Sequence, residues 1–171
     1  MAEPAELAAE LAKSAGFLAA HAVWCVSDGE VLVPFVGAEL TGGKRELTRF
    51  ADEARVEQAV ERAKAAFVDN LAGARMATLV FDGYVTLPSG PTDALVIASR
   101  TYSAPVIELE LLIPYRNAAS QDGFAVYRPK FTKVPEPLAE AQNTLAEAFF
   151  AGVDAHEQGS TVWNRHIDQS R

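Results

Sequence analysis

The spacing of apolar residues changes along this chain, and that change limits the fold more than any other feature of the sequence. Residues 4–19 and 54–72 repeat apolar side chains at intervals of three and four, which is typical of amphipathic helices. Residues 75–134 consist almost entirely of strand-forming residues, and the helical spacing returns from about residue 138, after Pro137. A long run of strands between helices predicts an antiparallel sheet with flanking helices, and therefore the α+β class.

Strands are also expected over residues 22–40. Asp28 and Gly29 lie there between β-branched residues, a pair typical of a tight hairpin turn. A second reversal is expected at residues 41–44, with a third strand over 45–51. The expected order of elements is therefore α-βββ-α-ββββ-α.

One short segment occurs twice. Residues 26–34 read VSDGEVLVP and residues 80–88 read VFDGYVTLP, with five of nine positions identical. Each copy is expected to form a hairpin whose turn is the Asp-Gly pair. Two interpretations stay open: an internal duplication of an α-ββ unit, or the same turn chemistry reached twice.

The length of 171 residues suits one domain, residues 1–171, with about 160–171 as a candidate protruding arm at the C-terminus. Gly152 and Gly159 are expected to interrupt the last helix, with Ser160 capping a short final helix.

Composition and charge exclude several classes of function. Asp and Glu number 23 against 15 Lys and Arg, so the net charge is −8, which disfavours binding to nucleic acid or to an anionic membrane. The single cysteine, Cys25, allows no intramolecular disulfide and no zinc site of several thiolates. The N-terminal residues do not resemble a signal peptide, and no apolar run is long enough to span a bilayer, so a cytoplasmic location is expected.

Tests for familiar catalytic patterns give no match. His21 and Cys25 would be ~13 Å apart on a strand, too far for a nucleophile and its base. His156 and His166 lack the spacing of a helical zinc site, and His156 is interpreted as a core or interface residue. The chain contains no phosphate-binding loop, no nucleophile elbow and no dinucleotide fingerprint, so we expect neither a metal nor a cofactor.

Carboxylates give equally little support for catalysis. Asp93 with Glu108 and Glu110 faintly resembles a nuclease arrangement, but the two glutamates fit better as the exposed face of a half-buried strand. Asp28 and Asp82 are explained by their expected place in turns.

Two sets of residues are candidates for binding. The first combines guanidinium, ammonium and aromatic groups suited to an anionic ligand, in a pocket between sheet and helices. Its members are Arg100, Tyr102, Tyr115, Arg116, Arg128 and Lys130. The second set is a candidate protein interface on the last helix, where glycines admit a close partner and large apolar residues supply contact area. Its members are Phe149, Gly152, His156, Gly159, Trp163 and Ile167.

The element order, together with the small mass and the acidic pI, resembles the fold of bacterial type III secretion chaperones. That resemblance implies a non-enzymatic protein, usually homodimeric, that holds an extended segment of a partner against helix and strand surfaces. The leading expectation is therefore a non-catalytic interaction module: a chaperone, an adaptor or an immunity-type protein. The alternative is a protein that binds a small anionic molecule, or an enzyme of unrecognised type. Nucleic-acid binding ranks third.

Overall fold

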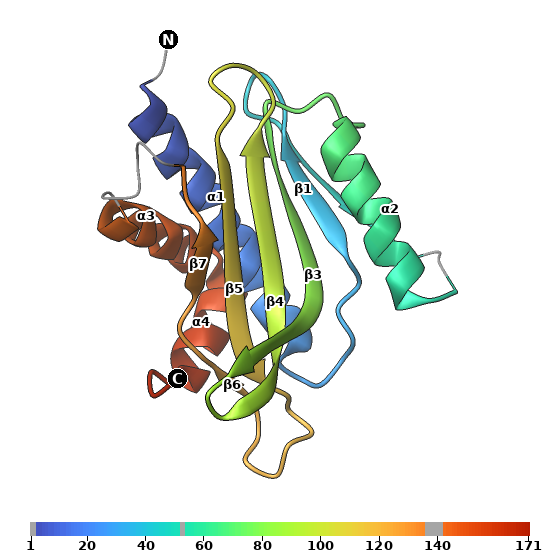
Figure 1. Ribbon diagram of the computed structural model, residues 1–171, viewed down its shortest axis with the longest axis vertical. Coiled ribbons are helices and arrows are strands. Elements are labelled where there is room, and N and C mark those ends of the chain that lie inside the picture. The colour runs from blue at the N-terminus through green and yellow to red at the C-terminus, as the bar shows by residue number, and fades with distance from the viewer. Residues whose placement is uncertain (1–2, 52–53, 136–141) are drawn as a thin grey trace.

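The computed structural model describes residues 3–51, 54–135 and 142–171, and it places helices against both faces of one antiparallel sheet (Figure 1). The elements in chain order are α1 (Pro4–Val26), β1 (Phe35–Glu39), β2 (Arg45–Arg49), α2 (Val56–Asp69), β3 (Met76–Leu87), β4 (Gly90–Thr101), β5 (Glu108–Arg116), β6 (Ala125–Val126), β7 (Lys130–Lys133), α3 (Gln142–Ala155) and α4 (Glu157–His166). The predicted α+β class is confirmed. The predicted helix start near residue 138 lies outside the described residues.

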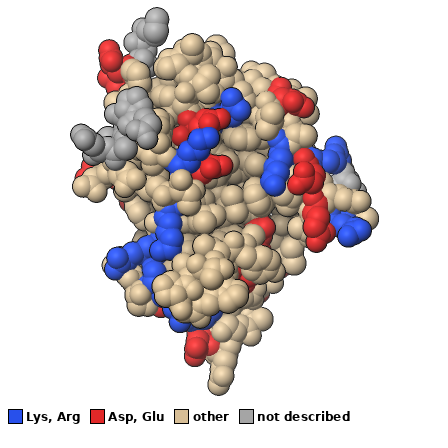
Figure 2. All heavy atoms as spheres, viewed as in Figure 1, with Lys and Arg blue, Asp and Glu red and all other residues tan. Residues whose placement is uncertain are grey.

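The strands follow the order β2-β1-β3-β4-β5-β6, and β7 also pairs with β5. Helices α1, α3 and α4 cover one face of the sheet, whereas α2 packs on the other face near β1 and β3. Figure 2 shows acidic and basic side chains along α2, beside a largely uncharged surface of the sheet.

The main core lies on the face that α1 covers. Leu109, Leu111 and Ile113 alternate along β5 and are fully buried there, and Leu95 and Ile97 do the same on β4. Burying each such side chain stabilises the fold by about 1.5–3 kcal/mol. Glu108 and Glu110 lie on the opposite, more exposed face, as expected for a half-buried strand.

The expectation of a strand from residue 22 is wrong, because α1 continues to Val26. Val23 and Val26 are strand formers by propensity, but both are buried in the main core. A β-branched residue in a helix costs well under about 1 kcal/mol relative to alanine. Burial of these two side chains in the core contributes more than this cost, so the helix continues.

The two Asp-Gly pairs do not form hairpin turns. Asp28 and Gly29 follow the end of α1, where the Asp28 carboxylate accepts a hydrogen bond from the Glu30 amide at 3.1 Å. Asp82 and Gly83 lie inside β3, and the β3–β4 reversal comes later, between Leu87 and Gly90. Because the two copies of the repeat have different secondary structure, the repeat does not mark a duplicated structural unit.

The closing helical segment breaks at His156. The His156 side chain caps α4, because its Nδ1 accepts a hydrogen bond from the Gly159 amide at 2.9 Å. The predicted cap at Ser160 is therefore wrong: the Ser160 hydroxyl donates to the carbonyl of Glu157 instead.

The candidate interface residues of this segment are largely buried within the chain. Phe149 and Trp163 belong to the main core, and His156 is buried. An added Cβ at Gly152 or Gly159 would collide with backbone of α1, so α1 is the close neighbour that these glycines admit.

The segment from residue 160 to residue 168 does not form a protruding arm, because its last residues are held against β6. Ile167 forms a parallel bridge with Val126 of β6, and the Asp168 amide donates to the Val126 carbonyl at 2.8 Å. Ile167 itself stays partly exposed.

We predict that Gly152→Ala lowers the free energy of unfolding by about 1–3 kcal/mol, the usual cost of overpacking. Alanine is the better helix former by about 1 kcal/mol, so propensity alone predicts the opposite sign. Urea denaturation measures the difference. The exposed neighbour Ala151, changed to Ser, is the matched control and should have little effect. An unchanged or higher stability of Gly152→Ala would contradict the close α1–α3 contact.

Candidate functional site

Two cavities lie along the seam between α1 and the edge strand β2. The first, of about 140 Å³, is lined by Ser14, Phe17 and Leu18 of α1, Gly37, Ala38 and Glu39 of β1, and Arg45, Glu46 and Leu47 of β2. The second, of about 250 Å³, is lined by His21, Trp24, Cys25, Asp28, Glu30, Val31, Leu32, Val33, Phe35 and Arg49. Successive turns of α1 and successive residues of β2 line the two cavities, so together they form one feature, here called the α1–β2 groove.

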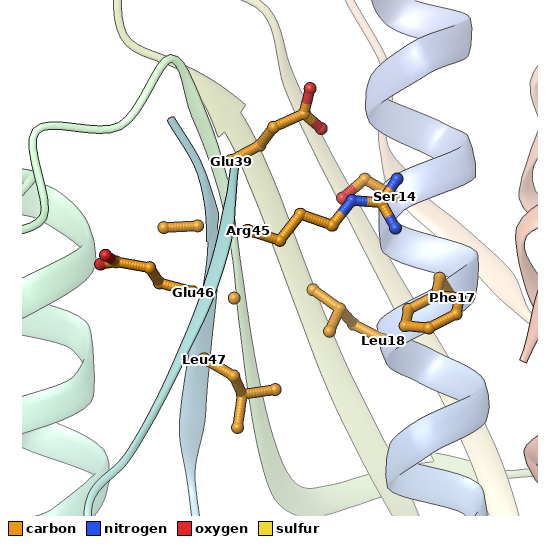
Figure 3. A pocket seen from close by; sticks show the side chains of 9 residues that line it. Ser14, Phe17, Leu18, Glu39, Arg45, Glu46 and Leu47 are labelled. Carbon is orange, nitrogen blue, oxygen red and sulfur yellow. The ribbon is translucent and has the colours of Figure 1, made fainter. Parts of the chain in front are cut away.

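The alternation of side chains along β2 aims three residues at this groove. Figure 3 shows Arg45 and Leu47 extending from β2 toward α1, while Glu46 points the other way. By the same period of two, Arg49 lies on the face of Arg45 and lines the second cavity.

Gly37 sets how closely α1 approaches the sheet at the first cavity. An added Cβ there would collide with the end of the Leu18 side chain, so Leu18 would have to move. The floor of the cavity is therefore the backbone of β1 with Leu18 and Phe17 beside it.

Two arginines, Arg45 and Arg49, line the groove together with the acidic residues Asp28, Glu30, Glu39 and Glu46. The Arg45 guanidinium lies 5.6 Å from the centre of the Phe17 ring. Among the residues that the structure describes, neither Arg45 nor Arg49 forms an ion pair. Two of the three groove glutamates, Glu39 and Glu46, do have cationic partners.

Those partners come from outside the groove. Glu39 pairs with Arg75 at 2.8 Å, and Glu46 pairs with Lys44 at 3.4 Å. Asp28 and Glu30 are exposed at the far end of the second cavity. Among the described residues, the groove charges without an ion pair are thus the two arginines along β2 and, at the far end, Asp28 and Glu30.

Large apolar side chains at the groove are partly open to solvent. Trp24 and Leu47 are each 43% exposed, one on the helix side and one on the strand side. β2 is also the last strand of the sheet on its side, so one edge of its backbone lacks a neighbouring strand among the described residues. Exposed apolar groups beside an open strand edge are typical of binding surfaces.

A pair of histidines links the second cavity to α4. His21 Nδ1 lies 3.2 Å from His156 Nε2. His156 Nδ1 accepts a hydrogen bond from the Gly159 amide, so it carries no proton and Nε2 carries one. His156 therefore donates to His21, and both rings are neutral in this arrangement.

The distance of ~13 Å predicted between His21 and Cys25 on a strand is wrong. Both residues lie on α1, one helical turn apart, and they line the same cavity. They still do not form a reactive pair. No hydrogen bond joins the two side chains in the described structure, and burial raises the pKa of the Cys25 thiol, which favours its protonated form. Within the described part of the chain, no group of three or more His, Cys, Asp or Glu residues could hold a metal ion.

The candidate anion-binding residues do not converge on one pocket. Arg100 lies over the Tyr102 ring at 5.3 Å and pairs with Glu108 at 3.8 Å. Tyr115 belongs to the core on the opposite face of the sheet, where its hydroxyl lies 2.8 and 2.9 Å from the carboxylate oxygens of Asp82.

The remaining basic residues lie at the edge of the sheet. Arg116 donates from Nε to the Gly123 carbonyl at 2.7 Å and thereby holds its own loop. Arg128 is exposed, and Lys130 begins β7, next to β5. The candidate set thus divides between two faces and an edge.

Comparison with models of known protein families, with curated proteins and with solved structures gave no match. No helix within residues 3–51, 54–135 and 142–171 is both long and apolar enough to cross a membrane.

We predict that protonation of the His21–His156 pair lowers the free energy of unfolding as the pH decreases. Burial lowers the pKa of His21 and of His156 below 6.5, and Arg49 adds to the effect on His21. The unfolded chain therefore binds more protons, so stability present above about pH 7.5 is lost as the pH falls through 6.5 toward the lower folded pKa values.

Urea denaturation between about pH 7.5 and 5 measures this decline. His156→Asn keeps a good capping side chain but removes one titrating group, so its decline should be shallower. His166→Asn is the control and should keep the wild-type slope. Equal slopes for wild type and His156→Asn would contradict this role of the pair.

We also predict that Tyr115→Phe lowers the free energy of unfolding by about 1–3 kcal/mol, because the half-buried Asp82 carboxylate loses its hydrogen-bond donor. The matched control is Tyr84→Phe, the same change at an exposed side chain two residues from Asp82. Thermal or urea unfolding compares the two variants, and equal stability would show that the Tyr115–Asp82 contact contributes nothing.

Proposed function

We propose that this protein is a non-catalytic interaction module, of the chaperone, adaptor or immunity type, that binds an extended segment of a partner protein in the α1–β2 groove. The segment carries apolar side chains for the two cavities and acidic side chains for Arg45 and Arg49. The observation that carries the proposal is the alignment of both cavities beside the open edge of β2.

The spacing of the groove suits an extended chain. Arg45 and Arg49 are four residues apart on β2, which corresponds to ~13 Å along a strand. A partner segment of about five residues in extended conformation spans the same distance and alternates its side chains with the same period.

The cavity volumes favour side chains over a metabolite. The two cavities measure about 140 and 250 Å³, below the roughly 300–1,000 Å³ typical of small-molecule pockets. Each is large enough for a side chain, and Leu47 and Trp24 provide apolar contact at the two cavities.

The charges favour an acidic partner segment. Arg45 and Arg49 lack ion pairs among the described residues, and Glu39 and Glu46 are already paired, so the acidic groove residues without an ion pair, Asp28 and Glu30, lie only at the far end. A guanidinium that meets a carboxylate in a partly buried site forms a strong, charge-assisted hydrogen bond.

Other sequence-based expectations remain predictions. They include the resemblance to type III secretion chaperones, a bacterial origin, a cytoplasmic location and a homodimer. The burial of Phe149, Gly152 and Gly159 against α1 leaves the α1–β2 groove as the better supported surface for a partner.

Selection of random peptides of about ten residues on the wild-type protein tests this proposal directly. We expect the selected peptides to combine acidic and apolar residues. The double variant Arg45→Glu/Arg49→Glu should bind them at least about tenfold more weakly, a change of 1.4 kcal/mol or more. Binding should also shift the Trp24 fluorescence, and the shift should be absent in Trp24→Phe.

Arg128→Glu is the matched control, because it reverses an exposed arginine outside the groove. It should bind the selected peptides like the wild type. Peptides that bind the double variant as tightly as the wild type, or that lose affinity only with Arg128→Glu, would overturn the assignment to this groove.

A further inference from the structure

The strand β3 is much longer than its neighbour β1. The antiparallel pairing of β1 with β3 ends at Phe35 and Val80, whereas β3 continues to Leu87 with only β4 beside it. Among the described residues, no strand pairs with the other edge of β3 from Phe81 to Leu87. Figure 1 shows this end of β3 curving away from β1.

A groove of about 540 Å³ opens beside this unpaired edge, between β3 and the first turns of α2. Its lining includes Val31, Val56, Glu57, Glu61, Gly83 and Tyr84, and it is here called the β3–α2 groove. Tyr84 is 81% exposed and Val31 is 70% exposed, which is unusual for side chains of this size. Gly83 contributes no side chain, so the groove reaches the strand backbone.

The charged residues of this groove are all acidic. Glu57 forms no ion pair among the described residues, and Glu61 has only Lys64, on its own helix, at 3.6 Å. No lysine or arginine belongs to the lining, in contrast to the two arginines of the α1–β2 groove; Lys64 lies at the margin, 5.1 Å from the centre of the Phe81 ring.

We propose that the β3–α2 groove is a second docking surface, which takes an extended segment that presents basic and apolar residues on the same face. The segment adds as a strand to the edge of β3 between Phe81 and Leu87, so its backbone hydrogen bonds continue the sheet. One set of its side chains enters the groove, where apolar residues contact Val31 and Val56 and basic residues meet Glu57 and Glu61.

A synthetic peptide of about nine residues serves as the probe; its lysines and valines follow one another in pairs, so that each face of the extended chain carries both. We expect it to bind, to shift the NMR signals of the amides from Phe81 to Leu87 and to slow the hydrogen exchange of those amides that face away from β4. Two companion peptides separate the causes of binding. A peptide N-methylated on alternate amides loses the backbone hydrogen bonds, and one with glutamate for lysine has the wrong charge; each should bind at least about tenfold more weakly.

Variants of the full chain locate the site. Glu57→Lys/Glu61→Lys should weaken binding of the lysine peptide at least about tenfold. Glu147→Lys/Glu157→Lys makes the same charge change at exposed positions of α3 and α4 and should bind like the wild type. The two surfaces are distinguished by Arg45→Glu/Arg49→Glu, which should leave binding of the lysine peptide unchanged.

Three results would overturn the proposal. The first is no binding of the lysine peptide to a folded wild-type chain. The second is equal loss of affinity in the two glutamate double variants, which would mean that net charge alone attracts the peptide. The third is a set of shifted amides that lies outside the segment from Phe81 to Leu87, whether at the α1–β2 groove or elsewhere.

Discussion

The contact of α1 with the sheet and with α3 at the same time holds this fold together. Alanines at positions 8, 12, 15 and 19 are fully buried on α1, and Gly16 lies against the backbone of Phe149. Small residues let the two helical backbones approach closely, and alanine has the highest helix propensity, so the same residues favour both the helix and its packing. Gly152 and Gly159 provide the matching close approach from α3 and α4.

The position of α1 also creates the α1–β2 groove. Because the helix continues to Val26, its last turns bring His21, Trp24 and Cys25 alongside β2. β2 itself is exposed over its whole length, with charged residues that discourage indiscriminate pairing at a sheet edge. The groove is therefore a consequence of where the first helix ends.

The two proposed surfaces share one segment, but only the α1–β2 groove is lined by arginines. Val31 lines both the second cavity of the α1–β2 groove and the β3–α2 groove, so the connection between α1 and β1 separates them. Its neighbour Glu30 lines only the first of these, together with Arg49. Partner segments of opposite charge would thus lie on either side of a single connecting segment.

Local sequence was sufficient for the class of fold and for part of its detail. The alternation around Glu108 and Glu110 correctly placed one face of β5 in the core, and the helical spacing correctly indicated α2. Both patterns reflect burial on one face of a single element, which is a local property of the chain. The same kind of pattern indicated a strand over residues 45–51, and β2 lies there.

Features that depend on contacts between distant residues were decided by the tertiary structure alone. The Asp-Gly pair at residue 28 follows the end of a helix, whereas the pair at residue 82 lies inside a strand. β4 supplies partners for the second copy, and no strand among the described residues pairs with the first. Tyr115 and Arg100 looked equivalent as ligand groups, but register places them on opposite faces of the sheet. The groove arginines had a local signal, the alternation of Arg45, Leu47 and Arg49, but only the packing of α1 against that face turns it into a site. Spacing along a chain specifies which side chains share a face, whereas the element that covers the face is chosen by the packing of the whole core.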